Sequence, residues 1–311
     1  MLFAFFLIAS CLILGIIFFN AKQDGPLKRK VIIEIPNSLS LLKISDLLFQ
    51  NNILGSRYNF ILLNYFTREY KNLKAGEYLF LPNISEREIT IKLVRNEVIL
   101  HRLTIPECYS NKKIIYKIEK TKELEGEISK NYVEGDFFPD TYFYPKGTPK
   151  VQILELMKNM AKRKINNAYK KVGVFPEGIN NIGEVLILAS LIEAEAKKGS
   201  EKKRIASVFL NRLKKGMKLQ SDPTVVYGLV GSVYLGRKLT KQDLNVEHIW
   251  NTYKINGLPA TPICNVGIDS IESVFSPMET NDLYFVADGK GGHHFSQTLE
   301  QHNRYVKNLK N

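Results

Sequence analysis

Two glutamates suited to proton transfer, Glu193 and Glu195, close an apolar segment that begins at Val185. On a helix, which turns about 100° per residue, Glu193 would lie in line with Leu186 and Ala189, while Glu195 would point to nearly the opposite side. A carboxyl partly removed from water has a raised pKa, so it can hold a proton near neutral pH and donate it to a leaving oxygen. The segment therefore predicts Glu193 as an acid–base residue. The alternative is a helix end whose carboxylate simply reaches solvent.

A second group of polar residues lies in the segment 219–228. Gln220, Asp222 and Thr224 could hydrogen-bond sugar hydroxyls or amides. The proline after Asp222 favours a turn, which would lead into a strand-like pair of valines. Capping of the following element by Ser221 or Asp222 is the alternative role.

A third candidate region is the segment 251–267, which is rich in Pro, Gly and Asn. Loops on a rigid scaffold often carry binding residues, and the ring of Tyr253 could stack on a sugar face. Asn251, Tyr253 and Asn265 are therefore candidate substrate-binding residues. The alternative is a long connection without a binding role.

Neither the histidines nor the cysteines have the spacing of a metal site. His293 and His302 are nine residues apart, and Cys11, Cys108 and Cys264 lack a C-x-x-C pair. We expect no metal and no cofactor. Cys108 and Cys264 could pair in an oxidising compartment, but sequence cannot show that they approach, and both are taken as free thiols.

Residues Leu2 to Phe19 form an uncharged stretch of 18 residues, about the minimum needed to cross ~30 Å of hydrocarbon. We expect an anchor at 1–20 and a linker at 21–30. The basic residues follow the stretch, which would place the body in the cytoplasm, although translocation of a long domain can override this bias. Lipidation of Cys11 is a weaker reading, because the apolar run continues past it.

The composition favours a folded protein with an anionic partner. The chain has 311 residues, of which 44% are hydrophobic, and 44 Lys and Arg against 31 Asp and Glu give a net charge of +13. Such a surplus suits anionic lipid, an acidic polymer or nucleic acid. The lysines are spread along the chain without a nucleic-acid motif, so no nucleic acid is expected as a partner.

The apolar patterns predict an α+β protein with two folded parts. Residues 31–105 read as a small α+β module, with strands at 31–35, 76–80 and 98–105, helices at 39–51 and 58–66, and a helix opened by a Ser85–Glu88 capping box. Residues 106–311 read as a larger α+β domain, with helices at 151–171, 182–197 and 202–214 followed by short strands and loops.

Taken together, the motifs resemble the MltG (YceG-like) family of endolytic murein transglycosylases over nearly the whole chain. The motifs are LKAGEY at 73–78, TIPE at 104–107, EGDFFPDTY at 134–142, ASLIEAE at 189–195, VFLNRL at 208–213, LQSDPTV at 219–225, NTY at 251–253, GLP at 257–259 and LYFVADG at 283–289. The chain departs from the usual family residue at Cys108, Ala260, Val266 and Gln301. These departures affect loops and leave the chemical assignment intact.

The resemblance implies a single-pass transmembrane helix in the cytoplasmic (inner) membrane, a LysM-like module at 31–105 and a catalytic domain at 106–311 facing the cell wall. It places the catalytic residue at the first Glu after the Ala-Ser-Leu-Ile run, which is Glu193. The implied reaction is lytic cleavage between N-acetylmuramic acid and N-acetylglucosamine of nascent glycan strands. The product would carry a 1,6-anhydromuramyl end, and strand elongation would stop there. The expected partners are glycan strands, the membrane and the peptidoglycan synthesis machinery.

A lytic mechanism needs only one carboxyl, because the muramyl C6 hydroxyl supplies the nucleophile and Glu193 can act first as acid and then as base. Two other readings stay open. One is a noncatalytic wall-binding or scaffold protein. The other is a hydrolytic muramidase, which would need a second carboxyl, with Asp222 as the first candidate.

Overall fold

The computed structural model describes the backbone of residues 2–309, and the side chains there except those of residues 2, 3, 6 and 7. Met1, at the start of the predicted anchor, and residues 310–311, at the end of the predicted catalytic domain, lie outside the described residues. The described chain is mostly helical with small two-stranded sheets, so the predicted α+β class is confirmed. It divides into two compact units, Met1–Arg102 with Phe143–Thr148 and Leu103–Tyr142 with Pro149–Asn311.

The first unit combines helices with one two-stranded antiparallel sheet, whose strands are separated in the chain by two helices. Its elements are α1 (Leu2–Ala21), β1 (Val31–Ile35), α2 (Leu41–Gln50), α3 (Arg57–Phe66), a 3₁₀ turn (Glu69–Lys71), β2 (Gly76–Phe80) and α4 (Glu86–Val94). Val31 of β1 pairs with Phe80 of β2. The predicted capping box is present, since Ser85 accepts from the Glu88 backbone while Glu88 accepts from the Ser85 backbone.

Helix α1 covers the predicted apolar stretch. Its C-terminal end packs on α3, where Ile17, Ala21 and Leu63 are buried together, while Ile8 and Leu12 are exposed. Among the described residues, no helix combines the length and the apolar character needed to cross a membrane.

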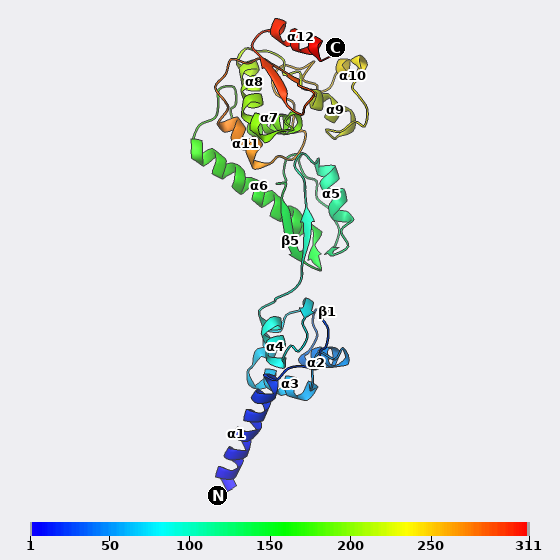
Figure 1. Ribbon diagram of the computed structural model, residues 1–311, viewed down its shortest axis with the longest axis vertical. Coiled ribbons are helices and arrows are strands. Elements are labelled where there is room, and N and C mark those ends of the chain that lie inside the picture. The colour runs from blue at the N-terminus through cyan, green and yellow to red at the C-terminus, as the bar shows by residue number, and fades with distance from the viewer. Residues whose placement is uncertain (1, 310–311) are drawn as a thin grey trace. The chain divides into compact units, whose positions relative to one another are not determined.

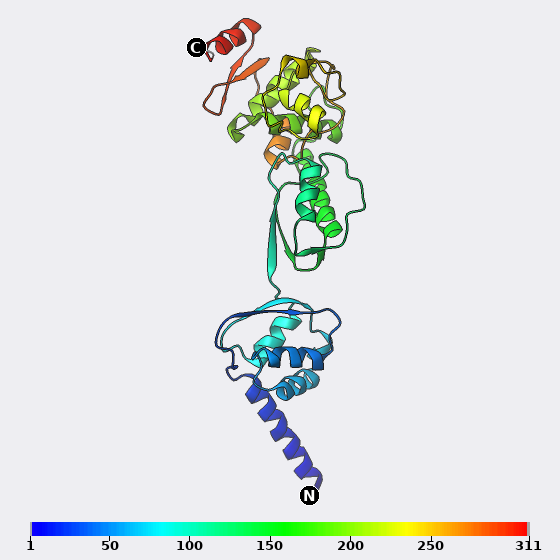
Figure 2. The same cartoon turned by 90° about the vertical axis from the view of Figure 1, so that its right-hand side faces the viewer.

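The second unit is built mainly from helices (Figure 1). Its elements are α5 (Asn111–Glu119), β4 (Leu124–Glu125), α6 (Lys150–Val172), α7 (Ile182–Glu195), a 3₁₀ turn (Gly199–Glu201), α8 (Lys202–Lys214), α9 (Asp222–Val230), α10 (Lys241–Asn245), α11 (Ile268–Phe275), β7 (Tyr284–Ala287), β8 (His293–Ser296) and α12 (Leu299–Asn308). The boundaries between the two units fall within three strands, β3 (Leu100–Thr104), β5 (Thr141–Pro145) and β6 (Thr148–Pro149). β3 pairs with β5, and β4 pairs with β6. Figure 2 shows β7, β8 and α12 gathered at one side of this unit.

One sequence expectation in this unit is wrong. The valines that follow Asp222 were expected in a strand, but they belong to helix α9. Pro223 occupies the first turn of α9, where its missing N–H leaves no helical hydrogen bond unmade. A proline at that place starts a helix as readily as it makes a turn.

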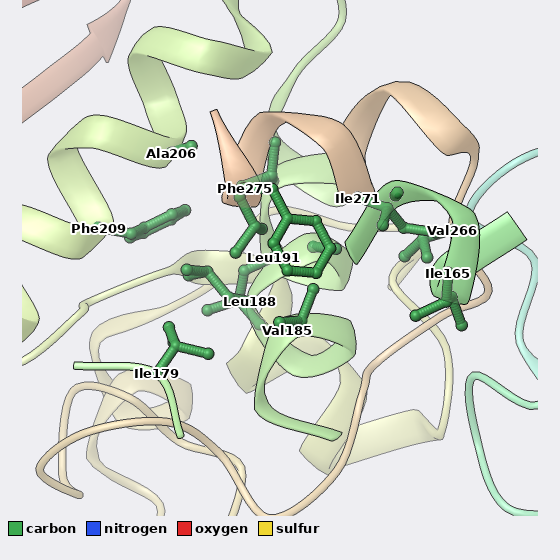
Figure 3. Close-up of a cluster of buried hydrophobic side chains, with 14 of the residues drawn as sticks. Ile165, Ile179, Val185, Leu188, Leu191, Ala206, Phe209, Val266, Ile271 and Phe275 are labelled. Carbon is green, nitrogen blue, oxygen red and sulfur yellow. The ribbon is translucent and has the colours of Figure 1, made fainter. Parts of the chain in front are cut away.

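Helix α7 lies at the centre of the core of the second unit. Val185, Leu188 and Leu191 have no exposed surface, and Figure 3 shows them beside Phe209 of α8 and Phe275 of α11. A helix that is apolar on all sides is stable only when neighbours cover it completely. The core therefore fixes α7 firmly and delivers its C-terminal glutamates to a defined place.

Cys108 and Cys264 form a disulfide across 156 residues of sequence, so the expectation of free thiols is wrong. Both cysteines lie in loops, and their approach depends on the tertiary fold rather than on local sequence. Cys108 has a φ of 57°, the left-handed region in which a side chain costs free energy. The cross-link therefore holds a backbone turn that most residues would not favour.

Removing the disulfide should lower the stability of the second unit. Replacing Cys264 with Ser should cost about 2–5 kcal/mol, because the denatured chain regains the freedom of a long loop. Thermal unfolding with and without reductant measures the effect, and Cys11→Ser, which changes an exposed free thiol, is the control. An unchanged melting temperature for Cys264→Ser would show that the cross-link contributes nothing.

Candidate functional site

Glu193 is locked in a buried ion pair at the end of α7. Its Oε1 accepts a hydrogen bond from Lys202 Nζ at 2.8 Å, and its Oε2 accepts from the Gly267 backbone at 3.0 Å and from Ser270 Oγ at 2.7 Å. The side chains of Glu193 and Lys202 are only 5% and 6% exposed. Both side-chain oxygens are occupied by protein donors, which suits a structural role.

The pair belongs to a larger cluster of side chains. Glu107 shares Lys202 at 3.5 Å, and burial, followed by the charge of Glu193, raises the pKa of Glu107. Gly267 lies so close that an added Cβ would come within 1.6 Å of Glu107 Oε1. This cluster of Glu107, Glu193, Lys202, Gly267 and Ser270 is named the α7 lock.

Glu195, two residues further on, lines a cavity of about 540 Å³ together with Gln220, Asp222 and Tyr253. Ser221 Oγ donates to Glu195 Oε1 at 2.6 Å. Burial raises the pKa of Glu195 to about 7, opposed by the Ser221 hydrogen bond and reinforced by the charge of Asp222. This carboxyl can therefore hold a proton near neutral pH within reach of a ligand.

Glu193 is buried, as the helix phase predicted, but it lies in the α7 lock, while Glu195, expected on nearly the opposite side, lines the cavity. Helix α7 is buried on nearly every side. Periodicity carries no directional information in such a helix. The resemblance places the catalytic residue at Glu193, and that assignment stays a prediction.

Three of the six expected binding residues meet in the cavity. Gln220 enters from a left-handed backbone position with φ of 51°, and Asp222 begins α9. Tyr253 Oη donates to Asp222 Oδ1 at 2.6 Å, and burial raises the pKa of Tyr253. Hydroxyl, carboxylate and amide groups thus converge beside Glu195.

The other three expected residues are buried away from the cavity wall and serve the backbone. Thr224 Oγ1 donates to the Ser221 carbonyl at 2.6 Å, and Asn251 Nδ2 donates to the Val246 carbonyl at 2.7 Å. Asn265 accepts from the Phe137 backbone at 2.8 Å and donates to Tyr109 O and Asn111 Oδ1. These contacts hold the loops that form the site.

The sequence analysis missed several residues of the cavity. The residues that line it also include Arg212 of α8, Tyr284 of β7 and His302 of α12. Arg212 and Tyr284 stand inside the motifs VFLNRL and LYFVADG, so their presence was visible. Nothing in the sequence indicated that α8, β7 and α12 border one cavity, because these elements meet only in the fold.

Comparison with known proteins agrees with this arrangement of motifs. A family model described as the YceG-like family matches residues 33–308. A protein named endolytic murein transglycosylase from Bacillus subtilis (strain 168) is 31% identical, with 89% of this chain and 84% of that protein covered. One of the same name from Streptococcus pneumoniae serotype 2 (strain D39 / NCTC 7466) is 26% identical over 91% of this chain, which spans 59% of that protein.

A solved structure is also similar. The crystal structure of a yceG-like protein from Listeria monocytogenes matches with a TM-score of 0.54 and 32% identity, covering 89% of this chain and 99% of that one. The family model spans most of the chain, including both glutamates of α7 and all the residues of the cavity named above. The chain therefore belongs to the YceG-like (MltG) family.

Proposed function

We propose that this protein is an endolytic peptidoglycan lytic transglycosylase, and that Glu195 rather than Glu193 is its acid–base residue. The names of the relatives support the reaction class. The observation that carries the residue assignment is the contrast at the end of α7: the carboxyl of Glu195 lines a polar cavity, while that of Glu193 is saturated by Lys202 and its neighbours.

In the proposed reaction, Glu195 donates its proton to the glycosidic oxygen that leaves C1 of the muramyl residue. The C1–O4 bond breaks, the muramyl C6 oxygen bonds to C1 of the same ring, and the C6 hydroxyl proton passes to Glu195. No water is consumed, and Glu195 is again protonated. The intramolecular nucleophile explains how one carboxyl can suffice.

Other groups of the cavity suit the charge that develops. An oxocarbenium-like transition state carries positive charge at C1, and the carboxylate of Asp222, fixed by Tyr253, can stabilise it. Ser221 orients Glu195, and Gln220 can bind an N-acetyl group. The residues assigned roles here all come from the second unit. The positioning role of the LysM-like module at 31–105 stays a prediction from the resemblance.

A hydrolytic muramidase is the second candidate, because Asp222 places a second carboxyl in the same cavity. Such an enzyme would use Asp222 to form a glycosyl intermediate or to activate water. The products separate the two reactions, since ring closure gives a muramyl end that is lighter by one water molecule than a hydrolytic reducing end.

Glu195→Gln should fold but lose about 10²- to 10⁴-fold in cleavage rate, because the amide cannot donate the proton. Glu193→Gln is the matched variant on the same helix turn. It should lower the melting temperature by breaking the ion pair with Lys202, yet retain more activity per folded molecule than Glu195→Gln. Mass spectrometry of digested glycan strands measures both rates and products. A greater loss of cleavage rate in folded Glu193→Gln than in Glu195→Gln would refute the assignment of Glu195 as the acid–base residue.

The raised pKa of Glu195 predicts a pH dependence. The protonated form is the proton donor, so kcat/KM should fall as pH rises through about 7. Because the folded pKa exceeds the ordinary value of 4.5, the native protein should also lose stability relative to Glu195→Gln as pH rises from about 4.5 to about 7. Measuring kcat/KM and the free energy of unfolding over the same pH range tests both expected decreases. If kcat/KM of Glu195→Gln still fell over the same pH range, that fall would belong to another titrating group.

We further propose that the protein is attached to the cytoplasmic membrane with its body outside. The apolar stretch at residues 2–19 and the disulfide between Cys108 and Cys264 support this location, because disulfides persist in oxidising compartments. Protease added to spheroplasts should degrade the body. Protection until lysis would contradict the outward orientation.

A further inference from the structure

The cavity contains a cation that the proposed reaction does not use. Arg212 is 8% exposed, and its guanidinium donates from Nε to the Leu283 carbonyl at 2.6 Å and from Nη1 to the Leu219 carbonyl at 2.8 Å. Within residues 2–309, no carboxylate lies within ion-pair distance of Arg212, and no hydrogen bond from Nη2 is found. A buried charge normally has a partner, because its desolvation is otherwise uncompensated.

His302 and Tyr284 form the cavity wall next to this cation. The Arg212 guanidinium carbon lies 5.1 Å from the centre of the Tyr284 ring, and the Tyr284 and His302 ring centres are 5.4 Å apart. In the described structure neither ring nitrogen of His302 has a hydrogen-bond partner, and Nδ1 is buried. Burial and the charge of Arg212 lower the pKa of His302, so the ring is neutral near pH 7 and adds no second charge.

We propose that Arg212 and His302 form a subsite for a carboxylate carried by the glycan substrate. The proposal rests on the proposed function, since it concerns the same cavity. A guanidinium with unused N–H groups matches the geometry of a carboxylate, and a neutral imidazole can donate one further hydrogen bond. A bound carboxylate would supply the counter-charge that the protein itself withholds.

Peptidoglycan offers this chemistry from two sources. The lactyl group of muramic acid bears a carboxylate when no stem peptide is attached, and stem peptides bear carboxylates of their own. Gln220, Asp222 and Tyr253 offer hydrogen bonds to the neutral parts of a sugar. The subsite would therefore select strands by their acidic substituent.

Binding to Glu195→Gln protein tests the proposal without turnover. The probes are glycan strands with intact stem peptides, strands stripped by an amidase, and strands whose carboxylates have been coupled to methylamine. One of the first two strands carries the carboxylate that the subsite recognises. That strand should bind roughly ten- to hundredfold more tightly than the strand coupled to methylamine. Tight binding of stripped strands identifies the lactyl group, and tight binding of the peptide-bearing strands identifies the stem peptide.

Second-site variants in the Glu195→Gln background separate recognition from folding. His302→Phe keeps the ring beside Tyr284 and removes both nitrogens, while Arg212→Gln removes the charge. Both should reduce the preference for carboxylate. Lys214→Gln removes an exposed charge from the same helix and should preserve the preference.

Equal binding of all three strands, or a preference that survives in folded Arg212→Gln, would overturn the subsite. Absence of binding to every strand would overturn it as well. A native enzyme that bound strands with carboxylate preference but formed neither anhydro nor reducing ends would instead refute the proposed function and leave the subsite standing.

Discussion

The buried ion pair between Glu193 and Lys202 is the interaction on which the site depends. Lys202 is the first residue of α8, and the carboxylate of Glu193 also accepts from Gly267 and Ser270 at the start of α11. One carboxylate thus joins the end of α7 to the beginnings of two helices, where the dipole of α11 favours negative charge. Breaking such a pair by removing one partner costs about 3–5 kcal/mol, because a charge is left buried.

The α7 lock also explains how two glutamates two residues apart acquire different chemistry. The carboxyl of Glu193 is buried and accepts hydrogen bonds from Lys202, Gly267 and Ser270. Within residues 2–309 no ion pair of Glu195 is found; its carboxyl accepts from the Ser221 hydroxyl and lies near the negative charge of Asp222. Environments that separate neighbouring carboxyls in this way are typical of sites where one acid must keep its proton.

Sequence reasoning worked where local patterns decide the structure. The Ser85–Glu88 capping box, the strand at 31–35 and the helix at 202–214 were all predicted and are present. Sequence reasoning failed where contacts between distant parts of the chain decide the structure. That Glu195 lines a cavity was not encoded in the phase of a helix buried on nearly all sides, and the pairing of cysteines 156 residues apart depends on loops that meet only in the folded domain. Gln220, Asp222 and Tyr253 were candidates because polar and aromatic side chains in loops often bind ligands, and the three line one cavity.

The most direct test of the central claim is a crystal structure of the Glu195→Gln protein with a muramyl-containing oligosaccharide bound across the cleavage point. The account predicts the scissile glycosidic oxygen at about 2.6–3.2 Å from the side-chain amide of residue 195, with Glu193 still bound to Lys202. A scissile oxygen beside Glu193, with the α7 lock opened to admit the sugar, would contradict it.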